Sequence, residues 1–177
     1  REVWLAAGLG PEASLAYNES VSLHLRGELD VAALRLAVRT LPARHDALRA
    51  TFGSDGLTVR AGAAPEISDL DVALRDLGPL TPAARAEELA AITARHVTEP
   101  FDLEHGPLIR AELVRLTPDH HVLVFTGHHI VLDGWSYWVI VKDLAANYGL
   151  ATGSRSAALA PAPSFLSARR GPSPPLF

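Results

Sequence analysis

The most informative stretch of the chain is HHIVLDG at residues 128–134, in which two adjacent histidines are followed by an aspartate and a glycine. An apolar run precedes it, and a segment with helical spacing follows it. Neighbouring side chains on a strand point to opposite faces. Only one of His128 and His129 can therefore face a shared site. An unperturbed histidine has a pKa of about 6.5, so that side chain could take or give a proton at neutral pH.

Asp133 and Gly134 occupy the expected turn between a strand and a helix. Asp133 could cap that helix, accept a buried ion pair, or do both. Gly134 lets the backbone approach a ligand closely. The N-terminus of the new helix would favour a negative charge that develops nearby.

The histidines also have competing interpretations. A histidine on a core strand is often no more than a hydrogen-bonded core residue. His120, His121, His128, His129 and Asp133 could resemble a set of metal ligands. However, the adjacent histidines diverge and no HExxH or CxxC spacing is present, so we expect no metal.

Composition narrows the class of protein. The chain has 177 residues, 48% of them hydrophobic, which fits one domain or one lobe of a larger domain. A net charge of −4 without a basic stripe argues against nucleic acid as a partner. With no cysteine, no signal peptide and no apolar run of about 18 residues, we expect a cytoplasmic protein that does not contact a membrane. Because the chain starts at Arg1 and contains no methionine, we expect it to be part of a longer polypeptide.

Hydrophobic periodicity predicts an α/β lobe with a mixed sheet, because strands alternate with helices. We expect the lobe to cover residues 1–150, and a mobile connector rich in glycine, proline, serine and alanine to cover residues 151–177. The expected strands are 20–26, 108–116 and a central strand at 121–127. The expected helices run from a cap at Asp30 to a kink or end at Pro42, from 82 to 97 and from 134 to 148, with a hairpin turn at 53–56.

Four segments together resemble the condensation domains of nonribosomal peptide synthetases. They are Trp4 with Tyr17-Asn18, RHDALRATF at 44–52, EPFDL at 99–103 with GPLIR at 106–110, and HHIVLDGWS at 128–136. The resemblance spans nearly all of residues 1–150. It implies the chloramphenicol acetyltransferase-like fold, in which two lobes form a V with the catalytic histidine between them.

The resemblance also implies a role for each site residue. His129 would be the catalytic histidine, and His128 and Gly134 would support the site. Asp133 would be structural and paired with an arginine of the second motif. Arg44 is the first choice for that partner and Arg49 is the second.

The implied reaction is amide formation between carrier-bound acyl and aminoacyl thioesters. Upstream and downstream carrier domains would be partners, and their phosphopantetheine arms would hold the substrates, so this chain would need no cofactor of its own. The order Gly134-Trp135-Ser136 favours ordinary condensation over epimerisation, and the first histidine argues against heterocyclisation.

Two alternatives stay open. The chain could be a non-catalytic carrier-docking or degenerate domain of a hybrid polyketide/peptide synthase, or it could belong to a different, ester-forming acyltransferase. Because the second lobe is absent, we expect the fragment to be inactive alone. We also expect the sheet surface that would face that lobe to be exposed and to promote self-association.

Overall fold

The computed structural model describes residues 2–8, 10–62, 70 and 72–165. Helices and strands are interspersed along the chain, as expected for an α/β lobe. They are α1 (Glu2–Ala7), α2 (Pro11–Leu15), β1 (Asn18–Arg26), α3 (Val31–Arg44), the 3₁₀ helix η1 (Asp46–Arg49), β2 (Ala50–Phe52), β3 (Val59–Ala61), β4 (Ala73–Asp76), α4 (Pro82–Thr98), β5 (Ile109–Thr117), β6 (His120–His128) and α5 (Gly134–Ala151).

The main sheet has the strand order β1-β6-β5-β4. β6 pairs antiparallel with β1 and β5, whereas β4 runs parallel to β5, so the prediction of a mixed sheet is confirmed. β6 is the central strand that its apolar run predicted, and all its residues from His121 to His128 are buried. Strands buried on both faces need a layer of helices on each side.

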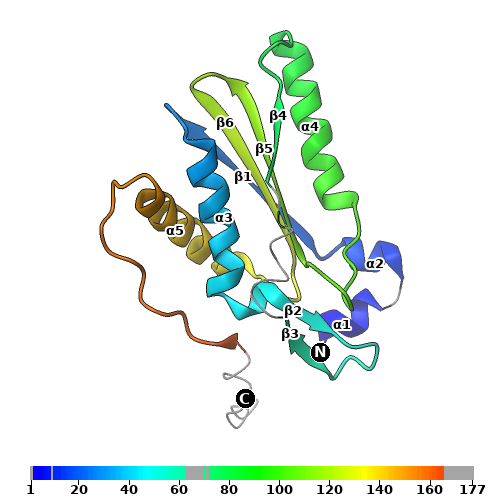
Figure 1. Ribbon diagram of the computed structural model, residues 1–177. Helices are drawn as coiled ribbons and strands as arrows, with labels where there is room; N and C mark the ends of the chain where they lie inside the picture. Colours follow the sequence, from blue (N-terminus) through cyan, green and yellow to red (C-terminus); the bar gives the residue numbers. More distant parts are fainter. Residues whose placement is uncertain (1, 9, 63–69, 71, 166–177) are drawn as a thin grey trace.

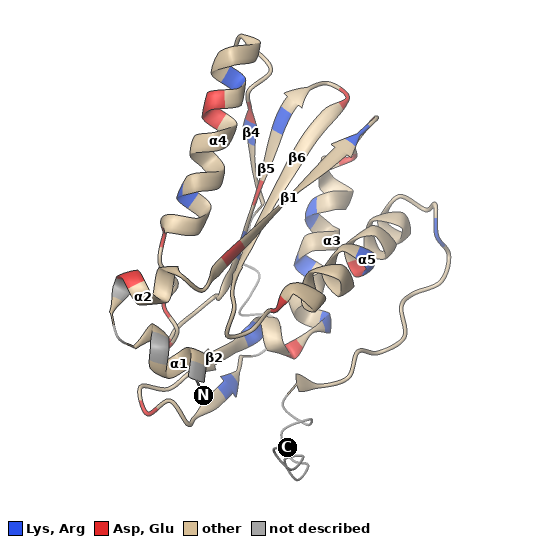
Figure 2. Ribbon diagram, turned by 180° about the vertical axis from the view of Figure 1, so that it is seen from behind, with Lys and Arg blue, Asp and Glu red and all other residues tan. Residues whose placement is uncertain are grey.

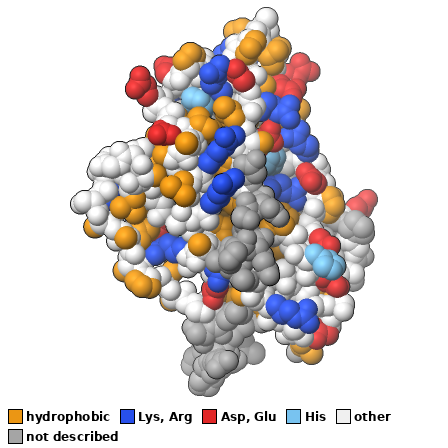
Figure 3. Space-filling model, viewed as in Figure 1, with side chains coloured by type: hydrophobic (Ala, Val, Ile, Leu, Met, Phe, Trp, Pro, Cys, Tyr) orange, Lys and Arg blue, Asp and Glu red, His pale blue; other side chains and the backbone are white. Residues whose placement is uncertain are grey.

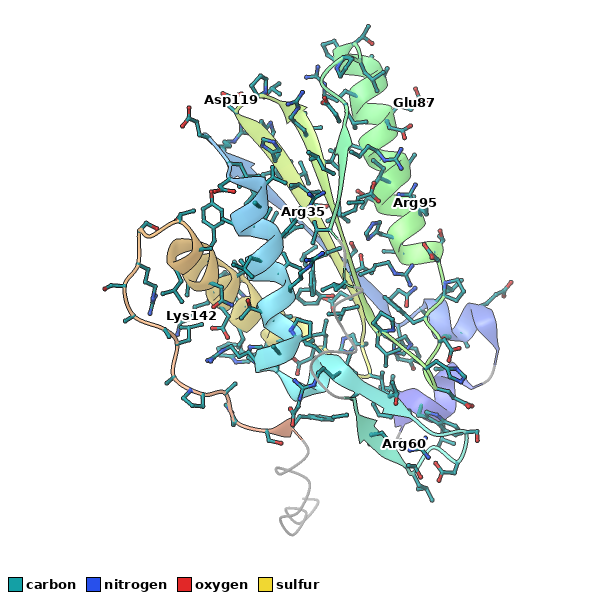
Figure 4. The ribbon with its side chains drawn as sticks, in the orientation of Figure 1. Arg35, Arg60, Glu87, Arg95, Asp119 and Lys142 are labelled. Carbon is teal, nitrogen blue, oxygen red and sulfur yellow. The ribbon has the colours of Figure 1, made fainter. Side chains whose placement is uncertain are left out.

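Helices cover both faces of this sheet (Figures 1 and 2). The larger core lies between the sheet and α3 and α5, where Leu41, Leu123 and Phe125 are fully or almost fully buried. The smaller core lies beneath α4 and contains Ile92 and Val122. Arg35, which lies between α3 and the strands in Figure 4, donates from Nε to the carbonyl of Val72 at 2.9 Å.

Side-chain caps set the helix starts that the sequence predicted. Asp30 accepts a hydrogen bond from the amide of Ala33 at the start of α3, and Pro82 lies in the first turn of α4. Pro42 lies inside α3, which ends two residues later at Arg44. Proline has no amide hydrogen, so Pro42 cannot donate the helical bond to the carbonyl four residues earlier. The helix ends two residues beyond it, so of the two predicted effects, a kink or an end, the end is confirmed.

The predicted turn at 53–56 joins β2 to β3, which pair antiparallel. Gly56 has a φ of +62° in this turn, and Asp55 Oδ1 accepts hydrogen bonds from the amides of Leu57 and Thr58. This hairpin lies with α1 at the end of the molecule where β6 ends and α5 begins (Figure 1). It therefore helps to build the surroundings of the histidine motif.

The boundary at residue 150 nearly coincides with the end of α5 at Ala151. Residues 152–164 contain no helix or strand and are mostly exposed, while residues 166–177 of the expected connector lie outside the described residues. No helix within the described part of the chain combines the length and apolarity needed to cross a membrane. Acidic and basic side chains are interspersed on the face shown in Figure 3.

Candidate active site

The two histidines diverge where β6 ends. The β1–β6 register places Asn18 opposite His128, and the His129 amide extends the pairing by donating to the Tyr17 carbonyl at 2.8 Å. His128 is fully buried, whereas the His129 side chain is 44% exposed. The strand geometry thus separates a buried ring from an accessible one, as the sequence predicted.

His128 is held by a small polar and aromatic enclosure. Its Nδ1 accepts a hydrogen bond from the Ile130 amide at 3.2 Å, so the proton of the neutral ring is on Nε2. Nε2 in turn lies 3.4 Å from Ser14 Oγ, and the Phe101 ring packs edge-on against the imidazole. Burial lowers the pKa of His128 to about 4, so the ring is uncharged at neutral pH.

His129 lies beside an open hollow. This cavity of about 170 Å³ is lined mainly by side chains from α1 and the β2–β3 hairpin, among them Trp4, Phe52 and Val59. The ring is therefore reachable from outside and is not locked in the apolar interior. An accessible imidazole at a strand end can meet a substrate and exchange a proton with it.

Asp133 forms a capping box at the start of α5. Its Oδ1 accepts hydrogen bonds from the backbone amide and the hydroxyl of Ser136, at 2.8 and 2.6 Å. The Ser136 hydroxyl lies 3.3 Å from the Asp133 amide and closes the box. These bonds from Ser136 lower the pKa of Asp133. A Cβ on Gly134 would meet open space, so the backbone next to the cap is accessible.

The predicted ion pair between Asp133 and Arg44 or Arg49 is wrong. Arg44 Nε donates instead to Asp143 Oδ2 at 2.6 Å. Arg49 uses its guanidinium to bind the backbone carbonyls of Pro42, Ala43 and Gly62.

Helix geometry explains the error. Asp143 lies ten residues after Asp133, which is about 15 Å further along α5, where α5 packs against α3. Arg44, at the end of α3, reaches this middle part of α5 rather than its capped start. Lys142, labelled in Figure 4, is exposed, whereas the next residue, Asp143, is buried.

Two acidic residues that the structure pairs with predicted site residues were not identified from the sequence. Asp143 falls on the buried stripe of α5 with Ile140 and Leu144, where an acid is unusual and signals a partner. Glu19 is in phase with Val21 on the apolar face of β1, and its Oε2 lies 3.6 Å from His129 Nε2. Both could have been recognised in the sequence, because each carboxylate occupies a position where the hydrophobic periodicity of its helix or strand predicts an apolar residue.

The other histidines of the suspected metal set lie far from this site. His120 starts β6 beside the turn that contains Asp119 (Figure 4), and its Nε2 lies 3.0 Å from His24 Nδ1. His128 ends the same strand. Among the described residues, no three His, Asp or Glu side chains gather in a metal-binding arrangement.

Comparison with curated proteins shows relatives among peptide synthetases. The chain is 40% identical over 166 residues to chondramide synthase cmdD of Chondromyces crocatus, and the match covers 92% of this chain and 4% of that protein. It is 35% identical over 153 residues to malpibaldin synthetase of Mortierella alpina, and that match covers 84% of this chain and 3% of the synthetase. The chain thus spans only a few hundredths of the length of these relatives.

Solved structures share the fold and are longer than this chain. The starter condensation domain of rhizomide synthetase RzmA superposes with a TM-score of 0.81 at 26% identity, covering 94% of this chain and 40% of that one. The X-domain from teicoplanin biosynthesis gives a TM-score of 0.75 at 36% identity, covering 90% and 33%. The Condensation domain profile matches residues 1–167. The chain therefore belongs to the condensation domain family of nonribosomal peptide synthetases, has its chloramphenicol acetyltransferase-like fold, and corresponds to the N-terminal lobe of that domain.

Proposed function

We propose that this lobe contributes the catalytic histidine, His129, to a domain that joins a carrier-bound acyl group to a carrier-bound aminoacyl group. The observation that carries the proposal is the contrast between the two rings. His128 is buried and neutral, while His129 faces an open hollow at the end of the same strand. A site built this way offers one accessible imidazole on a rigid support.

In the proposed reaction the acceptor amine attacks the carbonyl carbon of the upstream thioester. The new C–N bond forms as the C–S bond breaks, the upstream carrier leaves as a thiol, and the amine loses one proton. His129 takes that proton or orients the amine during the attack. Holding both tethered substrates in one cleft supplies much of the rate advantage, on the order of several kcal/mol.

The residues around His129 assist this chemistry by fixing its position. The Tyr17 carbonyl anchors its amide, and the Asp133 capping box fixes the start of α5 close behind it. The N-terminus of α5 would favour the negative charge that develops on the carbonyl oxygen. The substrates arrive on the phosphopantetheine arms of upstream and downstream carrier domains, which are the proposed partners, and the cytoplasm is the proposed location.

A second candidate function is partner docking without catalysis. The teicoplanin X-domain, which is 36% identical to this chain, has also been solved as a complex with OxyB. A domain of this fold can therefore bind another protein. The accessible His129 and the intact HHIVLDG segment favour catalysis for this chain.

The test is a reconstituted transfer. The complete domain that contains this lobe is mixed with an upstream carrier loaded with an acyl group and a downstream carrier loaded with an aminoacyl group. Mass spectrometry of the downstream carrier then identifies the product. An amide confirms the proposal, an ester on a hydroxyl-bearing acceptor points to the ester-forming alternative, and tight carrier binding without transfer supports docking alone. The lobe by itself, run in parallel, should give no product.

A further inference from the structure

Glu19 is held next to His129 by the backbone of β1 and β6. Glu19 pairs with Gly127, and the Tyr17 carbonyl accepts from the His129 amide, so both side chains leave the same face of the sheet as diagonal neighbours. The carbonyl of Glu19 also accepts a hydrogen bond from the Tyr137 hydroxyl at 2.6 Å. The main-chain bonds thus place the Glu19 and His129 side chains next to each other.

The carboxylate of Glu19 has an unused hydrogen-bonding capacity. Its Oε2 lies 3.6 Å from His129 Nε2, is shielded from solvent and has no hydrogen-bond partner among the described residues. The side chain as a whole is 39% exposed, so a substrate can reach it from solvent. A shielded acceptor without a donor is costly, and its presence in a folded protein calls for an explanation.

We propose that Glu19 and His129 together bind the ammonium group of the acceptor substrate, with Glu19 as the residue that selects an amine over a neutral nucleophile. This inference rests on the proposed function and adds a binding residue to it. The Glu19 carboxylate is an acceptor, and so is the His129 nitrogen in the neutral tautomer that leaves it unprotonated, whereas an ammonium group offers three donors and a positive charge. One substrate nitrogen could therefore satisfy both side chains before it loses its proton.

Charge distinguishes this role from a structural one. Replacing Glu19 with glutamine keeps the size of the side chain but removes its negative charge. The main-chain carbonyl that accepts the hydrogen bond from the Tyr137 hydroxyl is also kept. If Glu19 only supported the strand, Glu19→Gln would affect every acceptor equally. If it binds ammonium, the change would weaken charged acceptors and leave neutral ones as they were.

The experiment measures binding, so it does not depend on turnover. Two pantetheine amides, one of alanine and one of lactic acid, differ only in bearing an ammonium or a hydroxyl group. Each is titrated into the complete domain by NMR, in the unmodified protein, in Glu19→Gln, and in Glu28→Gln, which removes an exposed carboxylate between β1 and α3.

The unmodified domain and Glu28→Gln should bind the alanyl compound roughly fivefold more tightly than the lactyl compound, the scale expected for a partly exposed ion pair. Glu19→Gln should abolish this preference and leave the lactyl affinity unchanged. Equal affinities in the unmodified domain, or a preference that survives Glu19→Gln, would overturn the proposal for Glu19. If the domain prefers the alanyl compound but forms no product in the carrier transfer assay, only the proposed function is overturned.

Discussion

Arg44 on α3 and Asp143 on α5 form a partly buried ion pair, with 2.6 Å between Arg44 Nε and Asp143 Oδ2. His45 Nε2 approaches the same oxygen at 2.8 Å. Burial alone would raise the pKa of Asp143, but the hydrogen bonds from Arg44 and His45 outweigh it and lower the pKa. These bonds connect the start of the RHDALRATF segment at 44–52 to α5, the helix that follows the histidine motif.

Removing one partner of this pair should destabilise the lobe. Asp143→Ala would leave the Arg44 guanidinium without its acid, at an expected cost of about 3–5 kcal/mol in the free energy of unfolding. The double variant Arg44→Met/Asp143→Leu should lose much less, because no unpaired charge remains. Urea denaturation measures both, with Arg26→Ala at the exposed end of β1 as the control. If Asp143→Ala lost no more stability than Arg26→Ala, the ion pair would not have the structural role described here.

His128 should make the lobe sensitive to acid. Its folded pKa is lowered to about 4, chiefly by burial, whereas an unfolded histidine titrates at about 6.5. As the pH falls below about 6.5, the His128 ring binds a proton in the unfolded chain but not in the folded one. Stability should therefore be full above this pH and decrease by up to about 3 kcal/mol towards pH 4.

Two measurements check the prediction for His128. In His128→Asn the loss of stability between about pH 6.5 and pH 4 should be clearly smaller, provided that this variant folds. In the unmodified chain, NMR titration of the His128 ring should give a pKa near 4. The exposed His105 ring, whose pKa is raised by Asp102, is the internal comparison. A His128 ring that titrates near 6.5 would show that it is not enclosed as described.

Asp133 should contribute to stability as a helix cap and not as an ion-pair partner. Asp133→Ala removes the acceptor for the Ser136 amide and should cost about 1 kcal/mol. Asp133→Ser retains a capping oxygen and should lose little. Thermal unfolding of the two variants compares these outcomes. A loss of several kcal/mol in both variants would instead indicate a buried charge partner for Asp133.

Self-association of the lobe should depend on α5. Trp135 and Trp138 are 77% and 74% exposed, one helical turn apart, and Val139 lies next to them. The expected apolar surface is thus on this helix and not on the sheet, because helices cover both sheet faces. Trp135→Ser/Trp138→Ser should lower the apparent mass in light scattering, whereas Leu36→Ser on α3 should not. A monodisperse monomer of the unmodified chain at high concentration would refute this prediction.

The scaffold was predictable because it follows local rules. Alternating and continuous apolar runs located the main strands, Asp30 and Pro82 marked helix starts, and Gly53-Ser54-Asp55-Gly56 marked a hairpin. The divergence of His128 from His129 followed from the strand period alone. β4 was not among the expected strands, because its pairing with β5 is made between residues that are distant in sequence.

The contacts between polar side chains were not predictable in the same way. Asp143 meets Arg44 across 99 positions of sequence, and Glu19 meets His129 across a strand pair. Such contacts depend on how α3 crosses α5 and on the β1–β6 register, neither of which is encoded by local spacing. The resemblance to a family suggested an acid for Arg44 and named the wrong one.

His129, and not His128, should perform the transfer chemistry. The most direct measurement is the single-turnover rate of amide formation between loaded carriers, for the complete domain and for its His129→Ala variant. Loss of proton transfer or amine orientation should slow this step by roughly 10²–10⁴-fold while the variant stays folded, because His129 is exposed. An unchanged rate in a folded His129→Ala domain would contradict the account.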